Sequence, residues 1–304
     1  MRFIREKLFK ILSLLMLASL FLYEPIAAFG ASFSSFSTYN TEPRFSKILV
    51  IIAEGYAMQD NNVKSKDLLL KSIKLTPDDT IAHLELAAVY DNLDNLQGSA
   101  REYKKVLELS PNYKIINYYL GLTLDKMGKV DEALLYLDKA AELLPNNPLV
   151  FYDIGVIYAK NNDYKKSVYY SQKAVDLKPD FAEAYNNLCY GQAQTGNYME
   201  ALPNCKKAIE LRPDSAPALD SMGFVYYGMN DYIKAVEYYK KALNIDSKIG
   251  EIHLHLGKAY QMLNKFDEAS ASFAEYLKLE PNAVDYKEIS NLIKKKSHSK
   301  TEKK

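Results

Sequence analysis

Small and apolar residues recur along this chain with a period of 34 residues. In each period an apolar residue is followed directly by a small one, as in Leu86-Ala87 and Leu120-Gly121. A second small residue, such as Ala133, follows twelve positions later. Residues three, four and seven apart share one face of an α-helix, and small side chains on that face let a second helix approach. The pattern therefore predicts pairs of packed helices repeated along the chain.

Proline closes most of the periods. It stands at Pro77, Pro111, Pro145, Pro179 and Pro213, each 34 residues from the next, and again at Pro281. Proline ends a helix because it lacks the backbone N–H and clashes with the preceding turn. The Asp or Asn that follows most of these prolines is expected to cap the next helix. Ser247 takes the place of proline once in this series. We expect either that the preceding helix continues past this point or that the packing between the sixth and seventh periods is looser there.

A tight turn separates the two helices of each period. The turn residues, of types that tolerate the left-handed backbone conformation at a helix end, are Gly128, Asn162, Gly196, Asn230 and Asn264. Each period thus predicts a helix, a tight turn, a second helix and a proline connection. The seven periods are 46–79, 80–113, 114–147, 148–181, 182–215, 216–249 and 250–283.

The residues after the last period are predicted to close the array. We expect a capping helix over residues 284–296, which covers the last period with an apolar stripe. The stripe consists of Val284, Ile289, Leu292 and Ile293. The polar and basic residues 297–304 are expected to be a disordered tail.

The first thirty residues have the layout of a secretory signal peptide. A basic start precedes the apolar, uncharged run 11–23, and small residues follow up to Gly30. Cleavage after Gly30 would export the protein to the periplasm or the medium. The alternative is that residues 1–30 stay as an inner-membrane anchor facing out of the cytoplasm, although the run is short for a bilayer span of about 20 residues. Residues 31–45 are rich in Ser and are expected to form a flexible leader.

Composition and motifs narrow the function. The chain of 304 residues is 48% hydrophobic and 25% charged, and its net charge of +1 lacks the basic excess of a nucleic-acid binder. No Gly-rich phosphate loop and no paired-cysteine metal motif occurs. His253 and His255 are two residues apart, so they point to different faces of a helix. We expect His253 to fill a large-residue position of its repeat and His255 to lie on the surface. We therefore expect no catalytic site, no metal, no cofactor and no nucleic-acid partner.

The repeating unit resembles the tetratricopeptide repeat, in which a large residue-x₂-Leu-Gly-x₂-Tyr motif is followed by Ala, an aromatic residue, Ala and Pro at fixed offsets. The likeness is clearest over residues 114–281, where Ile154, Gly155 and Tyr158 fit the first motif. The resemblance implies an all-α fold, an α-solenoid wound as a right-handed superhelix of about seven helix-turn-helix repeats. It also implies that the first helices of the repeats line a concave groove that binds protein.

The resemblance places an apolar and aromatic stripe in that groove. The candidate peptide-binding residues are Leu84, Tyr118, Leu122, Tyr152, Val156, Asn186, Tyr190, Phe224 and Tyr227. Exposed apolar patches mark binding surfaces, and aromatic rings beside an amide suit a peptide. The alternatives are that the stripe packs as ordinary core between first helices, or that the leader of the chain itself fills the groove. The Lys and Asn with which this family clamps C-terminal carboxylates are absent from the corresponding positions, so we expect apolar anchoring.

The two cysteines of the chain, Cys189 and Cys205, fall in the same repeat, at positions that the resemblance directs into the space between its two helices. Export would permit a disulfide between them. The alternative is a pair of buried thiols that act as small apolar side chains.

These observations predict a non-enzymatic scaffold or adaptor that binds an apolar peptide or helix of a partner protein and aids an assembly in the envelope or the secretory route. One alternative is a factor tethered to the membrane through an uncleaved N-terminus. Another is a self-associating structural protein, a homodimer through its groove. The sequence does not name the partner.

Overall fold

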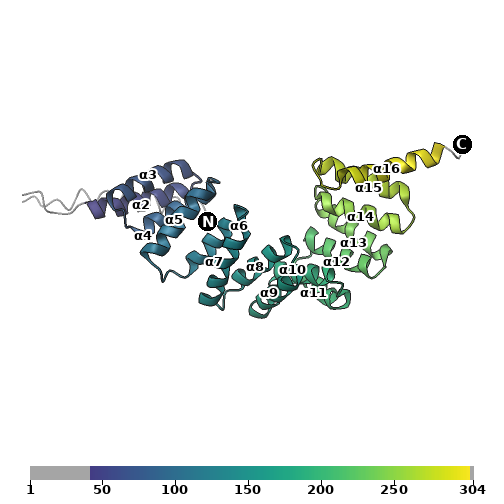
Figure 1. Ribbon diagram of the computed structural model, residues 1–304, viewed down its shortest axis with the longest axis horizontal. Helices are drawn as coiled ribbons and strands as arrows, with labels where there is room; N and C mark the ends of the chain where they lie inside the picture. The colour runs from purple at the N-terminus through teal and green to yellow at the C-terminus, as the bar shows by residue number, and fades with distance from the viewer. Residues whose placement is uncertain (1–41, 302–304) are drawn as a thin grey trace, which may run out of the picture. The chain divides into compact units, whose positions relative to one another are not determined.

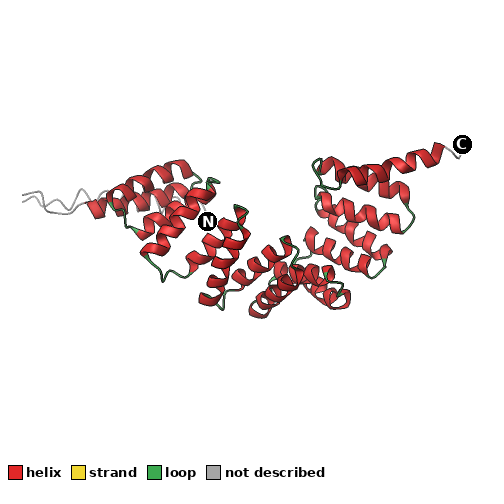
Figure 2. Cartoon of the chain, viewed as in Figure 1, coloured by secondary structure: helices red, strands yellow, loops and turns green. Residues whose placement is uncertain are grey.

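The structure is a computed structural model that describes residues 42–301. This range contains fifteen helices and no strand, and short loops join the helices (Figure 2). The fold is therefore an all-α solenoid of helix pairs, as predicted. The predicted signal peptide or anchor lies outside the described residues, as do residues 31–41 of the predicted leader.

The described chain divides into two compact units at Leu143-Leu144, and each is treated by itself below. The N-terminal unit consists of α2 (Glu42–Ala57), α3 (Asn62–Leu75), α4 (Thr80–Asn92), α5 (Leu96–Leu109), α6 (Ile115–Lys126) and α7 (Val130–Leu143). The C-terminal unit consists of α8 (Pro148–Lys160), α9 (Tyr164–Leu177), α10 (Ala182–Gln194), α11 (Tyr198–Leu211), α12 (Ala216–Gly228), α13 (Tyr232–Ile245), α14 (Gly250–Met262), α15 (Phe266–Leu279) and α16 (Tyr286–Thr301).

Each predicted period folds into a helix pair, from α2 with α3 to α14 with α15 (Figure 1). Within the N-terminal unit, α3 also packs on α4 and α5 on α6. In the C-terminal unit, α9 packs on α10, α11 on α12 and α13 on α14, while α16 covers α15. The first helices α8, α10, α12 and α14 contact one another in succession. This succession places the residues of consecutive first helices on one continuous surface of the C-terminal unit.

The turns within the helix pairs follow the prediction. The residues with positive φ are Asp60, Asp94, Gly128, Asn162, Gly196, Asn230 and Asn264, one between the helices of each pair. The helix caps agree less well with the prediction. At α4 and α8 the capping side chain lies two residues after proline, not one, because the helix begins three residues after proline: Asp79 accepts from the N–H groups of Ile81 and Ala82, and Asn147 from that of Leu149. Helices α6 and α10 have no side-chain cap.

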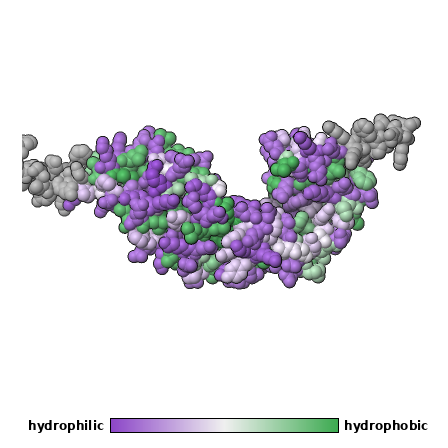
Figure 3. All heavy atoms as spheres, viewed as in Figure 1, coloured by the Kyte–Doolittle hydropathy of each residue, from purple (hydrophilic) through white to green (hydrophobic). Residues whose placement is uncertain are grey.

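The small positions of the repeat pattern lie where paired helices meet. Gly223 shows why: a Cβ atom there would lie 2.5 Å from the ring of Tyr239, a side chain of α13 that is almost completely buried. Cys189, Cys205 and Ala87 are also completely buried. Hydrophilic residues cover most of each unit on the face shown in Figure 3, and hydrophobic residues gather in smaller patches.

Two predictions about the ends of the array are corrected. Helix α2 begins at Glu42, inside the predicted flexible leader, because the first turn of a helix accommodates Pro43 without losing a hydrogen bond. Helix α16 runs to Thr301, so part of the predicted disordered tail is helical. On the capping stripe, Ile289 is buried and Leu292 and Ile293 pack beside it. Val284 is fully exposed because it precedes the helix.

The prediction for the joint at Ser247 is also wrong. Helix α13 ends at Ile245, the same place in its repeat as Leu177 at the end of α9. Proline is not needed there because Asp246 takes an extended conformation and its Oδ1 accepts the N–H of Lys248 at 2.9 Å.

Candidate functional site

The first helices of the C-terminal unit present a half-buried aromatic surface, which we call the first-helix face. It is formed by Tyr152 and Val156 of α8, Asn186 and Tyr190 of α10, and Phe224 and Tyr227 of α12. All six were candidates from the sequence, and each keeps part of its surface open to solvent. The rings of Tyr190 and Phe224 lie 6.1 Å apart, so the face is continuous between α10 and α12.

Further rings pack against this face. Tyr164 meets Tyr190 edge-on at 6.0 Å, and Phe224 lies 5.8 Å from His255, which in turn lies 5.6 Å from Tyr239. Pairs of rings at such distances attract each other beyond their buried area. The sequence interpretation missed Tyr164 and placed His255 on the surface, whereas the structure shows its side chain 13% exposed.

His255 joins α14 to α12 through a carboxylate. Its Nδ1 donates to Asp220, with Nδ1–Oδ1 2.9 Å and Nδ1–Oδ2 3.2 Å, and its Nε2 lies 3.9 Å from Glu251 Oε1. Burial by itself lowers the pKa of His255, but the charge and hydrogen bond of Asp220, together with the charge of Glu251, leave this pKa above its ordinary value. The imidazole beside Phe224 therefore holds its proton more strongly than an ordinary histidine.

The phenols of the face stay neutral. Burial, followed by the charges of Tyr164 and Glu251, raises the pKa of Tyr190 to about 12. Burial, followed by Asp153 and Glu183, also raises the pKa of Tyr152, and burial does the same for Tyr227. These side chains therefore offer rings and neutral hydroxyl groups to a partner.

A hollow of about 660 Å³ opens at one end of the first-helix face, and we call it the acidic hollow. It is lined by Tyr152, Ala182, Glu183, Asn186, Asn187, Ala208, Arg212, Asp214, Ser215, Ala216, Pro217, Ala218, Ile245, Asp246 and Ile249. Arg212 Nη2 lies 2.6 Å from Glu183 Oε1. Asn187 Nδ2 donates to Ser171 Oγ at 2.7 Å, but Asn186 Oδ1 is buried without a hydrogen-bond partner among the described residues. Such an orphaned acceptor costs about 1–3 kcal/mol unless a bound group satisfies it.

The candidate residues of the N-terminal unit form a weaker surface. Leu84 and Leu122 are half-buried. Tyr118, however, is only 8% exposed, because it packs beside Tyr119, which takes the outward place with 41% exposure. Tyr118 therefore offers little area to a partner, in contrast to the prediction.

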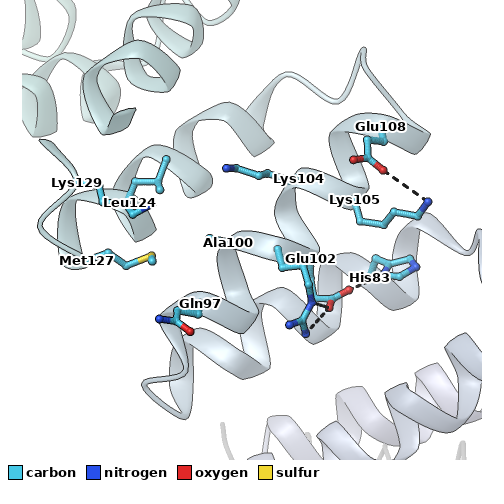
Figure 4. A pocket seen from close by; sticks show the side chains of 11 residues that line it. His83, Gln97, Ala100, Glu102, Lys104, Lys105, Glu108, Leu124, Met127 and Lys129 are labelled. Carbon is cyan, nitrogen blue, oxygen red and sulfur yellow. Dashed lines mark hydrogen bonds and ion pairs between the residues drawn. The ribbon is translucent and has the colours of Figure 1, made fainter. Parts of the chain in front are cut away.

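A second hollow, of about 690 Å³, lies in the N-terminal unit (Figure 4). It is lined largely by the second helix α5 and by the end of α6, away from the candidate residues. His83 and Glu102 point toward one another there, with His83 Nδ1 2.7 Å from Glu102 Oε2, and His83 Nε2 lies 2.9 Å from the carbonyl oxygen of Pro77. Arg101 Nη2 lies 2.9 Å from Glu102 Oε1.

The lysines of this hollow are paired with carboxylates. Lys105 lies 3.6 Å from Glu108, while Lys104 and Lys129 both lie near Glu132, at 3.9 and 3.0 Å. Exposed pairs of this kind contribute little to stability. Because Lys104 and Lys129 share Glu132, a single positive charge is left over, and one exposed charge does not make an anion site. We therefore interpret this hollow as a packed joint and not as a binding site.

The two cysteines lie under the first-helix face. Cys189 of α10 is next to Tyr190 in the sequence and faces Cys205 of α11. In the structure they form a disulfide, their Cα atoms are 5.2 Å apart, and both are completely buried. That Cys189 and Cys205 are bonded in the cell stays a prediction.

The two histidines of α14 each lie within hydrogen-bond distance of an oxygen atom in the described part of the chain. No group of three or more His, Cys, Asp or Glu side chains there could hold a metal ion. His253 Nε2 instead lies 3.0 Å from the carbonyl oxygen of Ser247, and His255 bonds to Asp220. Between residues 42 and 301, no helix is long and apolar enough to cross a membrane.

Sequence profiles of one repeat family match consecutive parts of the chain. Two profiles described as tetratricopeptide repeat match residues 180–248 and 226–293, and one described as the N-terminal tetratricopeptide repeat region of Psidin matches residues 85–201. Together they span 85–293, more than half of the chain. The protein belongs to the tetratricopeptide repeat family. None of the curated proteins matches the chain.

Solved structures of tetratricopeptide repeat (TPR) proteins resemble this one. YrrB, described as a TPR protein with an unusual peptide-binding site, is 26% identical over 62% of this chain and 97% of its own, with a TM-score of 0.53. The MamA protein is 26% identical over 58% of this chain and 96% of its own, with a TM-score of 0.51. A tetratricopeptide repeat protein from Parabacteroides merdae ATCC 43184 covers 83% of this chain and 98% of its own at 15% identity, with a TM-score of 0.66, which shows the fold alone.

Proposed function

We propose that this TPR protein is a non-enzymatic scaffold that binds an apolar peptide or helix of a partner protein on the first-helix face. The observation that carries the proposal is the set of half-buried rings on the first helices α8, α10 and α12, which is continuous between α10 and α12, where Tyr190 and Phe224 lie 6.1 Å apart. Rigid rings supply large contact areas at low entropic cost, and such residues dominate the binding energy of protein interfaces.

The surroundings of the rings suit a peptide rather than a small substrate. The face is open and extends over the first helices of three successive repeats. The neutral phenols of Tyr152, Tyr190 and Tyr227 can hydrogen-bond main-chain groups. The buried amide oxygen of Asn186 is a further acceptor that a bound N–H group could satisfy once the amide turns. The peptide-binding site in the description of YrrB, a structural relative, supports the same kind of function.

We place the protein outside the cytoplasm, in an assembly of the envelope or the secretory route. The support is the basic start, apolar run and small residues of positions 1–30, which are typical of a secretory signal peptide. Sequencing the N-terminus of the protein isolated from cells tests this placement. A mature chain that begins near residue 31 is expected, whereas an intact Met1 would indicate a tethered form.

The binding proposal is tested by substituting two rings of the face. We expect Tyr152→Ala with Tyr190→Ala to reduce crosslinking of the partner in cells by about tenfold or more, because two aromatic anchors are lost. The helical signal in circular dichroism should stay unchanged, since both side chains are half-buried and not in the core.

The matched control removes two tyrosines elsewhere in the same unit, Tyr169→Ala with Tyr286→Ala. Both are exposed, and neither belongs to the first-helix face. Equal capture of the same crosslinked partners by wild type and by the Tyr152 and Tyr190 double variant would refute the proposal. Equal loss in both double variants would also count against it.

A further inference from the structure

We propose that the acidic hollow binds a basic side chain of the partner segment, preferentially arginine, next to the apolar residue that occupies the first-helix face. This inference rests on the proposed function and specifies the chemistry of the partner. The hollow and the face share Tyr152 and Asn186, so one extended segment reaches both.

The charges that line the hollow leave a negative surplus. Arg212 is matched by Glu183, to which it is bonded at 2.6 Å. Asp214 and Asp246 also line the hollow, and neither forms an ion pair with a described residue. Both carboxylates are exposed, so they are available to a ligand. An acidic or phosphorylated ligand would meet two unmatched negative charges, whereas a cation would complete the pairing.

The rest of the lining fits the long stem of a basic side chain. Ile245, Ile249 and Pro217 provide apolar walls, which suit the methylene groups of arginine or lysine. The ring of Tyr152 provides a face for a cation, and its phenol stays neutral. A guanidinium group is favoured over an ammonium group because it is planar, stacks on a ring and bonds a carboxylate through two N–H groups.

The decisive variant removes the surplus charge and keeps the shape. In Asp214→Asn with Asp246→Asn, the amide oxygen at 246 can still accept the N–H of Lys248, which Asp246 Oδ1 accepts at 2.9 Å in the wild type. The matched control is Asp180→Asn with Glu210→Gln, which removes two exposed acidic charges from the same unit but none from the hollow.

The probe is a library of short random peptides displayed on phage and selected against the full chain. Peptides selected by the wild type and by the control variant are expected to be enriched in arginine or lysine near an apolar residue. Those selected by the Asp214 and Asp246 variant should keep the apolar residue and lose the basic one. Replacing the arginine of a selected synthetic peptide by citrulline, its neutral analogue, should weaken binding to the wild type about tenfold. The same replacement should have little effect on binding to the Asp214 and Asp246 variant.

The outcomes separate the two proposals. Selected peptides without basic enrichment, or an arginine preference that persists in the Asp214 and Asp246 variant, would overturn this inference and leave the binding function standing. If the variant Tyr152→Ala with Tyr190→Ala selects all the peptides that the wild type selects, both proposals are wrong.

Discussion

At the scale of single residues, the most informative group is His255. Its ring packs between Phe224 and Tyr239, and its Nδ1 donates to Asp220 on the neighbouring first helix. The charged groups that face it are Asp220 of α12, and Glu251 and Lys258 of its own helix α14. The two carboxylates outweigh the lysine and the cost of burial, so the pKa of His255 is raised above its ordinary value of 6.5.

This raised pKa makes the stability of the C-terminal unit depend on pH. A histidine whose pKa is higher in the folded chain contributes stability that is fully present below the unfolded value and is lost as the pH rises through the folded value. The stability difference between wild type and His255→Gln should therefore shrink as the pH rises from below 6.5, the ordinary value, through the higher pKa of the folded chain. Urea unfolding followed by far-ultraviolet circular dichroism measures it, which suits a chain without tryptophan.

The control is His253→Gln on the same helix. His253 bonds a backbone carbonyl oxygen instead of a carboxylate, so its substitution removes a histidine hydrogen bond from the same helix and leaves the carboxylates around His255 in place. A His255→Gln difference that stays constant or grows with rising pH would contradict the assignment.

At the scale of elements, the helix pairs, their turns and their small contact positions could be predicted because each is dictated within one repeat. Gly128 and Asn162, for example, have the positive φ that their residue types indicated. Pairings between repeats were harder to predict. Asp220 with His255 and Asp91 with Lys126 both join residues 35 positions apart, one more than the repeat period. A search for complementary side chains at that spacing would have found both pairs.

The acidic hollow could not be predicted by reading the first helices alone. Its unpaired carboxylates, Asp214 and Asp246, come from the connections after α11 and α13, and Arg212 is the residue that follows α11. The hollow therefore combines the connections of two successive repeats with residues of the first helices. The burial of Tyr118 could not be predicted from the sequence either. The adjacent residue, Tyr119, is also a tyrosine, and only the packing decides which of the two rings points outward.

The disulfide prediction depends on the packing of α10 against α11. Cys189 and Cys205 are 16 residues apart, and a bridge that closes a loop of this length stabilises a protein by about 3 kcal/mol. We expect dithiothreitol to lower the urea midpoint of the wild-type protein isolated from cells and to leave that of Cys189→Ala with Cys205→Ala unchanged. Non-reducing mass spectrometry that finds two free thiols would refute the bridge.

At the scale of the whole molecule, stability follows from the repeat architecture. Each helix pair buries its apolar surface mainly against its neighbours, so the pair at the end of an array needs a cover. In the C-terminal unit this cover is α16, which places Ile289 against the cluster that contains Phe273 and Tyr276. Tyr276 also donates its hydroxyl hydrogen to Asp285 Oδ1 at 2.6 Å, which ties the connection before α16 to α15.

This arrangement predicts that a substitution in α16 destabilises only the repeats next to it. Ile289 is 3% exposed, so Ile289→Ala should remove about 2–4 kcal/mol from the stability of the last repeat. Because repeats interact with their nearest neighbours, hydrogen exchange should accelerate in α14, α15 and α16 and stay nearly unchanged in α8 and α9. Val284→Ala is the matched control, since Val284 is fully exposed and its loss should change neither exchange nor the urea midpoint. Accelerated exchange throughout the C-terminal unit in Ile289→Ala would show that the array unfolds as one cooperative block, contrary to the nearest-neighbour account.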